Sequence, residues 1–304
     1  KRVLRADRGN MTRPTVSEVY AYRQHVDSEM IKLIEEGVSS NVEELLVLGL
    51  NHEQQHQELL ITDLKYILGH NPLFPIYKQG FRLSSGLNED SGWETIPEGI
   101  YLIGHDGDGF SYDNEYDRHR VFLEEFQISR QLVTCGEWIE FIEDGGYDSF
   151  NHWLDEGWTW VQENGIKAPL YWHKIDGQWF QYTLSGLIPV NPNEIVCHVS
   201  FFEASAFAEW KGMRLPTEFE WEAASQELHW GQRWEWTNSA YLPYPGYNKP
   251  EGAVGEYNGK FMINQMVLRG AATSTAEGHS RSTYRNFFHT HLRWQCTGLR
   301  LVKR

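Results

Sequence analysis

The chain has 304 residues, of which 40% are hydrophobic and 14% aromatic, so it is long enough to form two cores or one large one. Its formal charge of −15 argues against binding along a phosphate backbone, and we exclude nucleic acid as a partner. No apolar run approaches the ~20 residues that span a membrane, and the basic segment 1–13 has no apolar stretch behind it, so we expect a cytoplasmic protein without membrane anchor or signal peptide.

Two helices are predicted at the start of the chain. A capping box at Thr15–Glu18 begins the first helix, whose apolar residues keep helical spacing until Gly37. A second capping pattern at 41–44 begins the next helix, which ends at Gly69. Because two helices cannot bury both of their faces, we expect residues 1–74 to be a partial helical bundle that lacks its N-terminal helices.

The second predicted helix carries the sequence His-Glu-Gln-Gln-His. At helical spacing, His52 and His56 lie on the same side as Leu45, Leu48 and Leu59, which is the side that a core-facing helix buries. Two neutral imidazoles one turn apart are typical of metal ligands in helical bundles. The alternative is a pair of hydrogen-bonded histidines on a partly exposed helix, and the spacing does not name the metal. A catalytic metal usually takes about three protein ligands, so this pair needs another one.

Residues 75–304 are predicted to form a second domain of the α+β class. Short alternating stretches such as 99–104 and 120–128 lie between Gly, Asp and Asn clusters and predict strands. Helical spacing predicts three short helices in this domain, at 134–142, 200–210 and 217–224. We therefore expect strands and long loops with a few short helices.

Two smaller features of this domain predict no special site. The glycine-flanked Asp106 and Asp108 lack the full spacing of a calcium-binding loop and predict a plain turn. Cys135, Cys197 and Cys296 are odd in number and far apart, which favours reduced, buried thiols over disulfides. A nucleophilic role for one of these cysteines is the less favoured alternative.

Several strings resemble a known family. Residues 214–224, Arg-Leu-Pro-Thr-Glu-Phe-Glu-Trp-Glu-Ala-Ala, and 234–237, Trp-Glu-Trp-Thr, resemble the formylglycine-generating-enzyme or sulfatase-modifying-factor fold, a C-type-lectin-like α+β domain. Together with the His-Glu-Gln-Gln-His helix, the chain from about residue 8 to 304 resembles the EgtB-type sulfoxide synthases of ergothioneine biosynthesis, which join a DinB-like helical bundle to that domain. This chain departs from the family between Trp230 and Gly231, where members usually carry a longer loop.

The resemblance implies a non-haem iron(II) enzyme. Such enzymes use O2 to join the sulfur of cysteine to the imidazole C2 carbon of hercynine, the trimethylated betaine of histidine, and they form a sulfoxide. Members hold Fe(II) with three histidines, and His52 and His56 match the second and third. We expect the first histidine upstream of residue 1, and His25 is a disfavoured substitute within the chain.

The resemblance also implies substrate-binding residues. Gln55 matches a glutamine that reaches the substrate imidazole, and Asn286, Phe287 and Phe288 match the position that touches the trimethylammonium group. The alternatives are a solvent-facing residue for Gln55 and plain core packing for Phe287 and Phe288.

The sulfur donor is expected to be free cysteine. Members that take γ-glutamylcysteine have an acidic residue and an arginine where this chain has Phe288 and Leu292. Family members bind the donor carboxylate through an arginine that precedes the first helix of this chain, so Arg2 and Arg5, or Arg8, are the candidates.

Two points stay open at this stage. The proton-donating tyrosine that the family uses is not assigned, although Tyr241, Tyr244 and Tyr247 lie in the loop where one branch has it. The competing functions are an ovothiol-type synthase that acts on histidine, and a non-catalytic relative that has lost its metal site.

Overall fold

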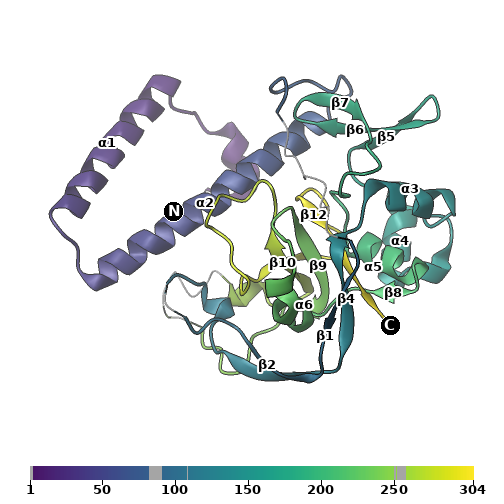
Figure 1. Cartoon of the computed structure of the whole chain (residues 1–304). Helices are drawn as coiled ribbons and strands as arrows, with labels where there is room; N and C mark the ends of the chain where they lie inside the picture. Colours follow the sequence, from purple (N-terminus) through teal and green to yellow (C-terminus); the bar gives the residue numbers. More distant parts are fainter. Residues whose placement is uncertain (1–2, 82–90, 108, 250, 252–257) are drawn as a thin grey trace. The chain divides into compact units, whose positions relative to one another are not determined.

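The computed structural model describes residues 3–81, 91–107, 109–249, 251 and 258–304 (Figure 1). Contacts between residues divide the chain into two compact units, Lys1–Leu50 and Asn51–Arg304. The domain boundary expected after residue 74 stays a prediction. Within the described residues, no helix is both long enough and apolar enough to cross a membrane.

Both predicted N-terminal helices are present. A 3₁₀ turn, η1 (Arg5–Asn10), precedes α1 (Val16–Glu35) and α2 (Ser40–Gly69). α1 begins where predicted because the Thr15 hydroxyl accepts a hydrogen bond from the Glu18 N–H, while the Glu18 carboxylate accepts one from the Thr15 N–H at 2.7 Å. The second half of α2, from Asn51 onward, belongs to the second unit. Of the expected bundle, the described residues contain these two helices.

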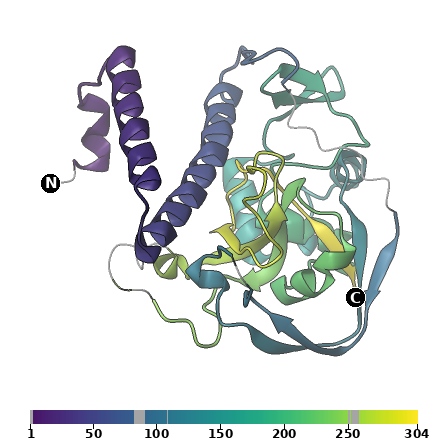
Figure 2. The same ribbon diagram turned by 60° about the vertical axis from the view of Figure 1, so that its left-hand side comes forward.

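Strands of the second unit form two four-stranded sheets, in the orders β1-β4-β13-β8 and β11-β10-β9-β12, and the smaller sheets β2-β3 and β5-β6-β7. Their bounds are β1 Trp93–Ile96, β2 Gly99–Ile103, β3 His119–Leu123, β4 Phe126–Leu132, β5 Trp172–Ile175, β6 Gln178–Thr183, β7 Gly186–Pro189, β8 Met213–Arg214, β9 Arg233–Ala240, β10 Gln265–Ala271, β11 Asn286–His289, β12 Thr297–Gly298 and β13 Arg300–Lys303. The yellow C-terminal strand β13 pairs with the much earlier β4 (Figure 2). The predicted α+β class is confirmed.

One predicted strand is in fact two. Residues 120–128 contribute to β3 and β4, which are separated by Glu124 and Glu125. β3 pairs with β2, whereas β4 pairs with β1 and β13. The alternating pattern runs through this break, so it did not mark the place where the chain changes sheets.

Short helices connect the sheets. The three predicted ones are α3 (Cys135–Glu143), α5 (Phe201–Trp210) and α6 (Glu218–Ala224), and each begins with a complete capping box. α4 (Asp155–Asn164) was not predicted, and its N-cap position holds Leu154, which makes no capping side-chain bond. Further 3₁₀ turns among the described residues are η2 Asp113–Glu115, η3 Phe150–His152, η4 Ser225–Glu227 and η6 Gly259–Phe261.

Buried ion pairs join the strings 214–224 and 234–237 to later residues of the chain. Glu235 of β9 and Arg300 of β13 are both fully buried, with Nε of the arginine 2.8 Å from Oε2 of the glutamate. The same oxygen also accepts a hydrogen bond from Nε1 of Trp221 in α6. Glu218 of α6 pairs in the same way with Arg285, which directly precedes β11. These pairs therefore connect α6 to the residue before β11, and β9 to β13.

Removing one member of such a pair should destabilise the fold strongly. Glu235→Ala leaves the Arg300 guanidinium buried without its carboxylate, and we expect the free energy of unfolding to fall by about 3–5 kcal/mol. The control is Glu209→Ala at the exposed pair with Arg304, where a loss below about 1 kcal/mol is expected. Urea unfolding of both variants measures this, and equal losses would contradict the account.

Candidate functional site

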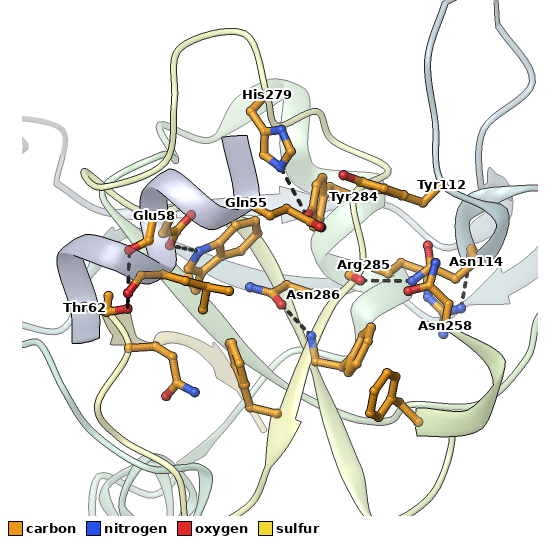
Figure 3. A pocket seen from close by; sticks show the side chains of 16 residues that line it. Gln55, Glu58, Thr62, Tyr112, Asn114, Asn258, His279, Tyr284, Arg285 and Asn286 are labelled. Carbon is orange, nitrogen blue, oxygen red and sulfur yellow. Dashed lines mark hydrogen bonds between the residues drawn. The ribbon is translucent and has the colours of Figure 1, made fainter. Parts of the chain in front are cut away.

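A pocket of about 250 Å³ lies in the second unit, between α2 and the segment that leads into β11 (Figure 3). It is lined by Gln55, Glu58, Leu59 and Thr62 of α2, and by Tyr112, Asn114, Trp234, Asn258, Phe261, His279, Tyr284, Arg285, Asn286, Phe287, Phe288 and Gln295. Four predicted substrate-binding residues, Gln55, Asn286, Phe287 and Phe288, are thus brought together from positions more than 200 residues apart. Their roles stay proposals.

Glu58 holds α2 against the β-rich part of the unit. Its carboxylate accepts hydrogen bonds from Nε1 of Trp234 at 2.7 Å, from the hydroxyl of Thr275 at 2.7 Å and from that of Ser274 at 3.3 Å. Burial raises the pKa of Glu58 to about 7, although the three donors oppose this rise. The anchor is therefore a buried carboxyl group that titrates near neutrality.

Gln55, one turn earlier, reaches a buried tyrosine. Its Nε2 donates a hydrogen bond to the hydroxyl of Tyr284 at 2.8 Å, and Nε2 of His279 lies 3.3 Å from the same hydroxyl. Burial raises the pKa of Tyr284 well above its usual value. Burial and the nearby charge of Arg281 lower the pKa of His279 to about 4, so the ring is uncharged at neutral pH.

Strand β11 supplies the aromatic wall of the pocket. It pairs antiparallel with β10, and the three pocket residues Asn286, Phe287 and Phe288 are half-buried. The Phe287 ring stacks on Tyr241 with ring centroids 4.0 Å apart and an interplanar angle of 9°. Stacking on Tyr241 therefore fixes the orientation of the Phe287 ring, which lines the pocket.

The proposed metal ligands lie on α2 but do not line the pocket. The ring centroids of His52 and His56 are 4.6 Å apart, and the rings are nearly perpendicular at 82°. Two imidazole nitrogens about 2.1 Å from one metal ion, with the bonds near a right angle, would place the ring centres about 4.5 Å apart. The observed ring separation matches this value, although no third histidine, cysteine or carboxylate joins the pair among the residues that the structure describes.

Within the second unit, the side of α2 that is buried differs from the predicted one. His52, His56 and Leu59 are exposed, whereas Thr62 and Lys65 are buried and Glu58 is half-buried. Polar residues can face the interior here because each finds a partner. Nζ of Lys65, for example, lies 2.7 Å from Nε2 of His198. Hydrophobic spacing alone does not detect such a face.

Other candidates lie elsewhere. Arg2 is outside the described residues, and Arg5, Arg8 and the exposed His25 belong to the first unit. Tyr241, Tyr244 and Tyr247 bond to Asn114, Glu218 and Asp113 respectively, and none of the three lines the pocket. Tyr112 and Tyr284 do line it, and sequence reasoning missed both. Asp106 pairs with Arg118, and Asp108 is outside the described residues.

A separate cluster contains two of the three free cysteines. The ligand atoms of Cys197, His198 and Cys296 lie within 4.8 Å of one another, the one such group of three in the described part of the chain. Burial opposes ionisation of Cys197, but a hydrogen bond from Cys296 and the charges of Arg233 and Lys65 lower its pKa to about 6. Cationic side chains this close disfavour a metal cation, so we assign the cluster no metal.

The buried Glu58 predicts a pH-dependent stability. Because its pKa is raised from 4.5 in the unfolded chain to about 7 in the fold, its contribution is fully present below pH 4.5 and is lost as the pH rises through 7. Relative to Glu58→Gln, wild type should lose roughly 3 kcal/mol of its free energy of unfolding as the pH rises from 4.5 to 8. Denaturant unfolding across this range tests it, with the exposed Glu98→Gln as control. Parallel pH profiles for wild type and Glu58→Gln would refute the assignment.

Comparisons with known proteins agree with this architecture. A model of the sulfatase-modifying factor enzyme 1-like domain matches residues 88–233. The formylglycine-generating enzyme of Thermomonospora curvata is 31% identical over 48% of this chain and 52% of its own length. Hercynine oxygenase of Mycolicibacterium thermoresistibile is 31% identical over 83% of this chain and 67% of its own, and that of Mycolicibacterium smegmatis is 30% identical over 98% and 80%. The chain therefore belongs to the hercynine oxygenase family of enzymes.

Proposed function

We propose that this protein forms a carbon–sulfur bond between cysteine and the imidazole C2 carbon of hercynine, with O2 as oxidant and Fe(II) as cofactor. The observation that carries the proposal is the position of Gln55, which shares one helix with the His52–His56 pair and one pocket with Asn286, Phe287 and Phe288. In the balanced reaction the C2–H and S–H bonds break, the C–S bond forms, one oxygen atom ends on sulfur and the other leaves as water. The product is hercynylcysteine sulfoxide, an intermediate of ergothioneine biosynthesis.

His52 and His56 would hold the iron, as their ring separation fits. When bound, the iron supplies redox chemistry with O2 that side chains of the described pocket cannot supply. The chain's own residues bind and orient the organic substrates. Holding both substrates in one place makes their reaction effectively intramolecular.

The pocket suits the two ends of hercynine. A trimethylammonium group offers no hydrogen-bond donor and is attracted to aromatic faces, which Phe287 and Phe288 provide. The imidazole would meet Gln55 at the helix side of the pocket, directly or through a water. Tyr284 stays protonated because burial raises its pKa, so at this position it holds a proton.

The donor carboxylate needs a cation from outside this set. Arg285 lines the pocket, but Glu218 already neutralises it through two hydrogen bonds. We therefore propose Arg2 or Arg5 for this role, since a guanidinium can bind a carboxylate through two parallel hydrogen bonds. Phe288 and Leu292 carry no charge that could bind the extra carboxylate and ammonium of γ-glutamylcysteine, which supports free cysteine as donor.

The two metal-ligand histidines can be tested separately from the fold. His52→Ala and His56→Ala should each lose bound iron and lower sulfoxide formation more than about 100-fold, because each removes a metal ligand. Both side chains are exposed, so neither substitution should destabilise the fold. Iron analysis and product detection by mass spectrometry measure this. His70→Ala, at an exposed position directly after α2, is the control. Full activity in either α2 variant would end the assignment.

The donor preference can be tested by competition. We expect kcat/KM for cysteine to exceed that for γ-glutamylcysteine at least about tenfold, because the second donor brings charges that the pocket leaves unpaired. The double variant Phe288→Asp with Leu292→Arg should shift this ratio toward γ-glutamylcysteine, and Leu292→Arg alone is the control. A wild-type preference for γ-glutamylcysteine would contradict the proposal, as would the absence of any shift in the double variant. Turnover of histidine at the rate of hercynine would favour an ovothiol-type synthase.

A further inference from the structure

A chain of hydrogen bonds leaves α2, passes through two buried rings and returns to α2. It starts at Gln55, whose Nε2 bonds to the Tyr284 hydroxyl at 2.8 Å. It continues from that hydroxyl to Nε2 of His279 at 3.3 Å, and ends where Nδ1 of His279 lies 3.0 Å from Oε1 of Gln54. Figure 3 shows His279 and Tyr284 beside Gln55 at one edge of the pocket. Neighbouring residues of one helix are thus joined through groups more than 220 positions away.

The hydrogen bonds of this chain all donate in one direction, from His279 to Gln54, from Tyr284 to His279 and from Gln55 to Tyr284. A neutral imidazole has one nitrogen that donates and one that accepts. Nδ1 faces the carbonyl oxygen of Gln54 and therefore carries the hydrogen, so Nε2 accepts from the Tyr284 hydroxyl. The oxygen of that hydroxyl then accepts from the Gln55 amide nitrogen. The opposite direction would require both amides to turn over and the ring hydrogen to change nitrogen.

The two rings in the middle cannot readily move. The Tyr284 ring packs against Trp234 and Tyr112, with centroids 5.2 and 5.6 Å away, and the Arg281 guanidinium lies 5.2 Å over it. His279 is 1% exposed and packs against Tyr284. Three hydrogen bonds to Glu58, one turn further along α2, keep the helix itself in place. This chain of hydrogen bonds is therefore a rigid support for the Gln55 side chain, not a surface contact.

Resting on the proposed function, we propose that Tyr284 and His279 are positioning residues that fix the orientation of the Gln55 amide and so select an imidazole ligand that donates an N–H. With its nitrogen bonded to Tyr284, the amide directs its carbonyl oxygen away from that hydroxyl, and a carbonyl oxygen has two lone pairs for hydrogen bonds. An imidazole that offers one nitrogen to a metal carries its hydrogen on the other, which is the donor this oxygen can accept. An imidazole methylated on that nitrogen has no hydrogen to give.

The test compares binding of hercynine with binding of its two ring-N-methylated isomers, by calorimetry on the full chain without O2. We expect wild type to favour hercynine over the tighter isomer by about tenfold or more. Tyr284→Phe keeps the ring and removes the hydroxyl, so the amide can turn over. Its preference for hercynine should fall severalfold. Because a loosened pocket would also admit the extra methyl group, a carboxylate variant is needed to separate the two causes. Tyr101→Phe removes a hydroxyl that bonds to the Pro97 carbonyl and does not line the pocket, and it should keep the wild-type preference.

A carboxylate separates orientation from simple contact. Gln55→Glu presents oxygen acceptors on both sides, so at pH 8 the double variant Tyr284→Phe with Gln55→Glu should regain most of the preference that Tyr284→Phe loses. If Tyr284→Phe does not fold, Gln54→Leu interrupts the chain at its half-buried end on α2 and should reduce the preference in the same direction.

The outcomes are distinct. Wild-type preference retained in Tyr284→Phe overturns the positioning role and leaves the proposed function standing. A double variant that stays unselective also overturns it, because the acceptor orientation would then not matter. A wild type that does not bind hercynine overturns the proposed function together with the inference.

Discussion

The hydrogen bonds that hold the Glu58 side chain are the constraint on which the site depends. This carboxylate of α2 receives three hydrogen bonds, one from the indole of Trp234 in β9 and two from the hydroxyls of Ser274 and Thr275. They fix the rotation of α2 about its own axis within the second unit. Gln55 lies one turn before Glu58 on the same side, so this rotation delivers it to Tyr284. His52 and His56 then take their positions as a consequence of the same rotation.

The anchor is polar, which has an energetic cost and a benefit for specificity. An apolar contact at this point would tolerate small rotations of the helix, whereas three directional hydrogen bonds do not. The cost is the burial of a carboxyl group, visible in its pKa of about 7. The same choice recurs at Lys65 with His198 and at the ion pairs of Glu218 and Glu235. The unit is held in register by buried polar pairs around an aromatic core.

Local signals in the sequence were sufficient for part of this structure. Helices α1, α3, α5 and α6 begin at capping boxes because that motif is satisfied within four residues. Gln55, Asn286, Phe287 and Phe288 came from the family resemblance, and they do meet in one pocket. Glu58, His279 and Tyr284 could not be found in this way. Their importance lies in partners that are 176 to 229 residues distant, and no local spacing encodes such a contact. The break in the strand at 124–125 was missed because alternation continues across it.

The buried face of α2 shows why the same helix could mislead. Apolar spacing assigned the interior to the side of His52 and His56, yet the side that enters the second unit carries Gln55, Glu58, Thr62 and Lys65. A helix face that lines a pocket with polar side chains cannot also bury an apolar stripe there. Its attachment must then come from polar residues, each matched to a distant partner. The anchor at Glu58 and the pocket residue Gln55 thus share one face of α2. A change that weakens the anchor should therefore also disturb the amide of Gln55, even though Gln55 itself is unaltered.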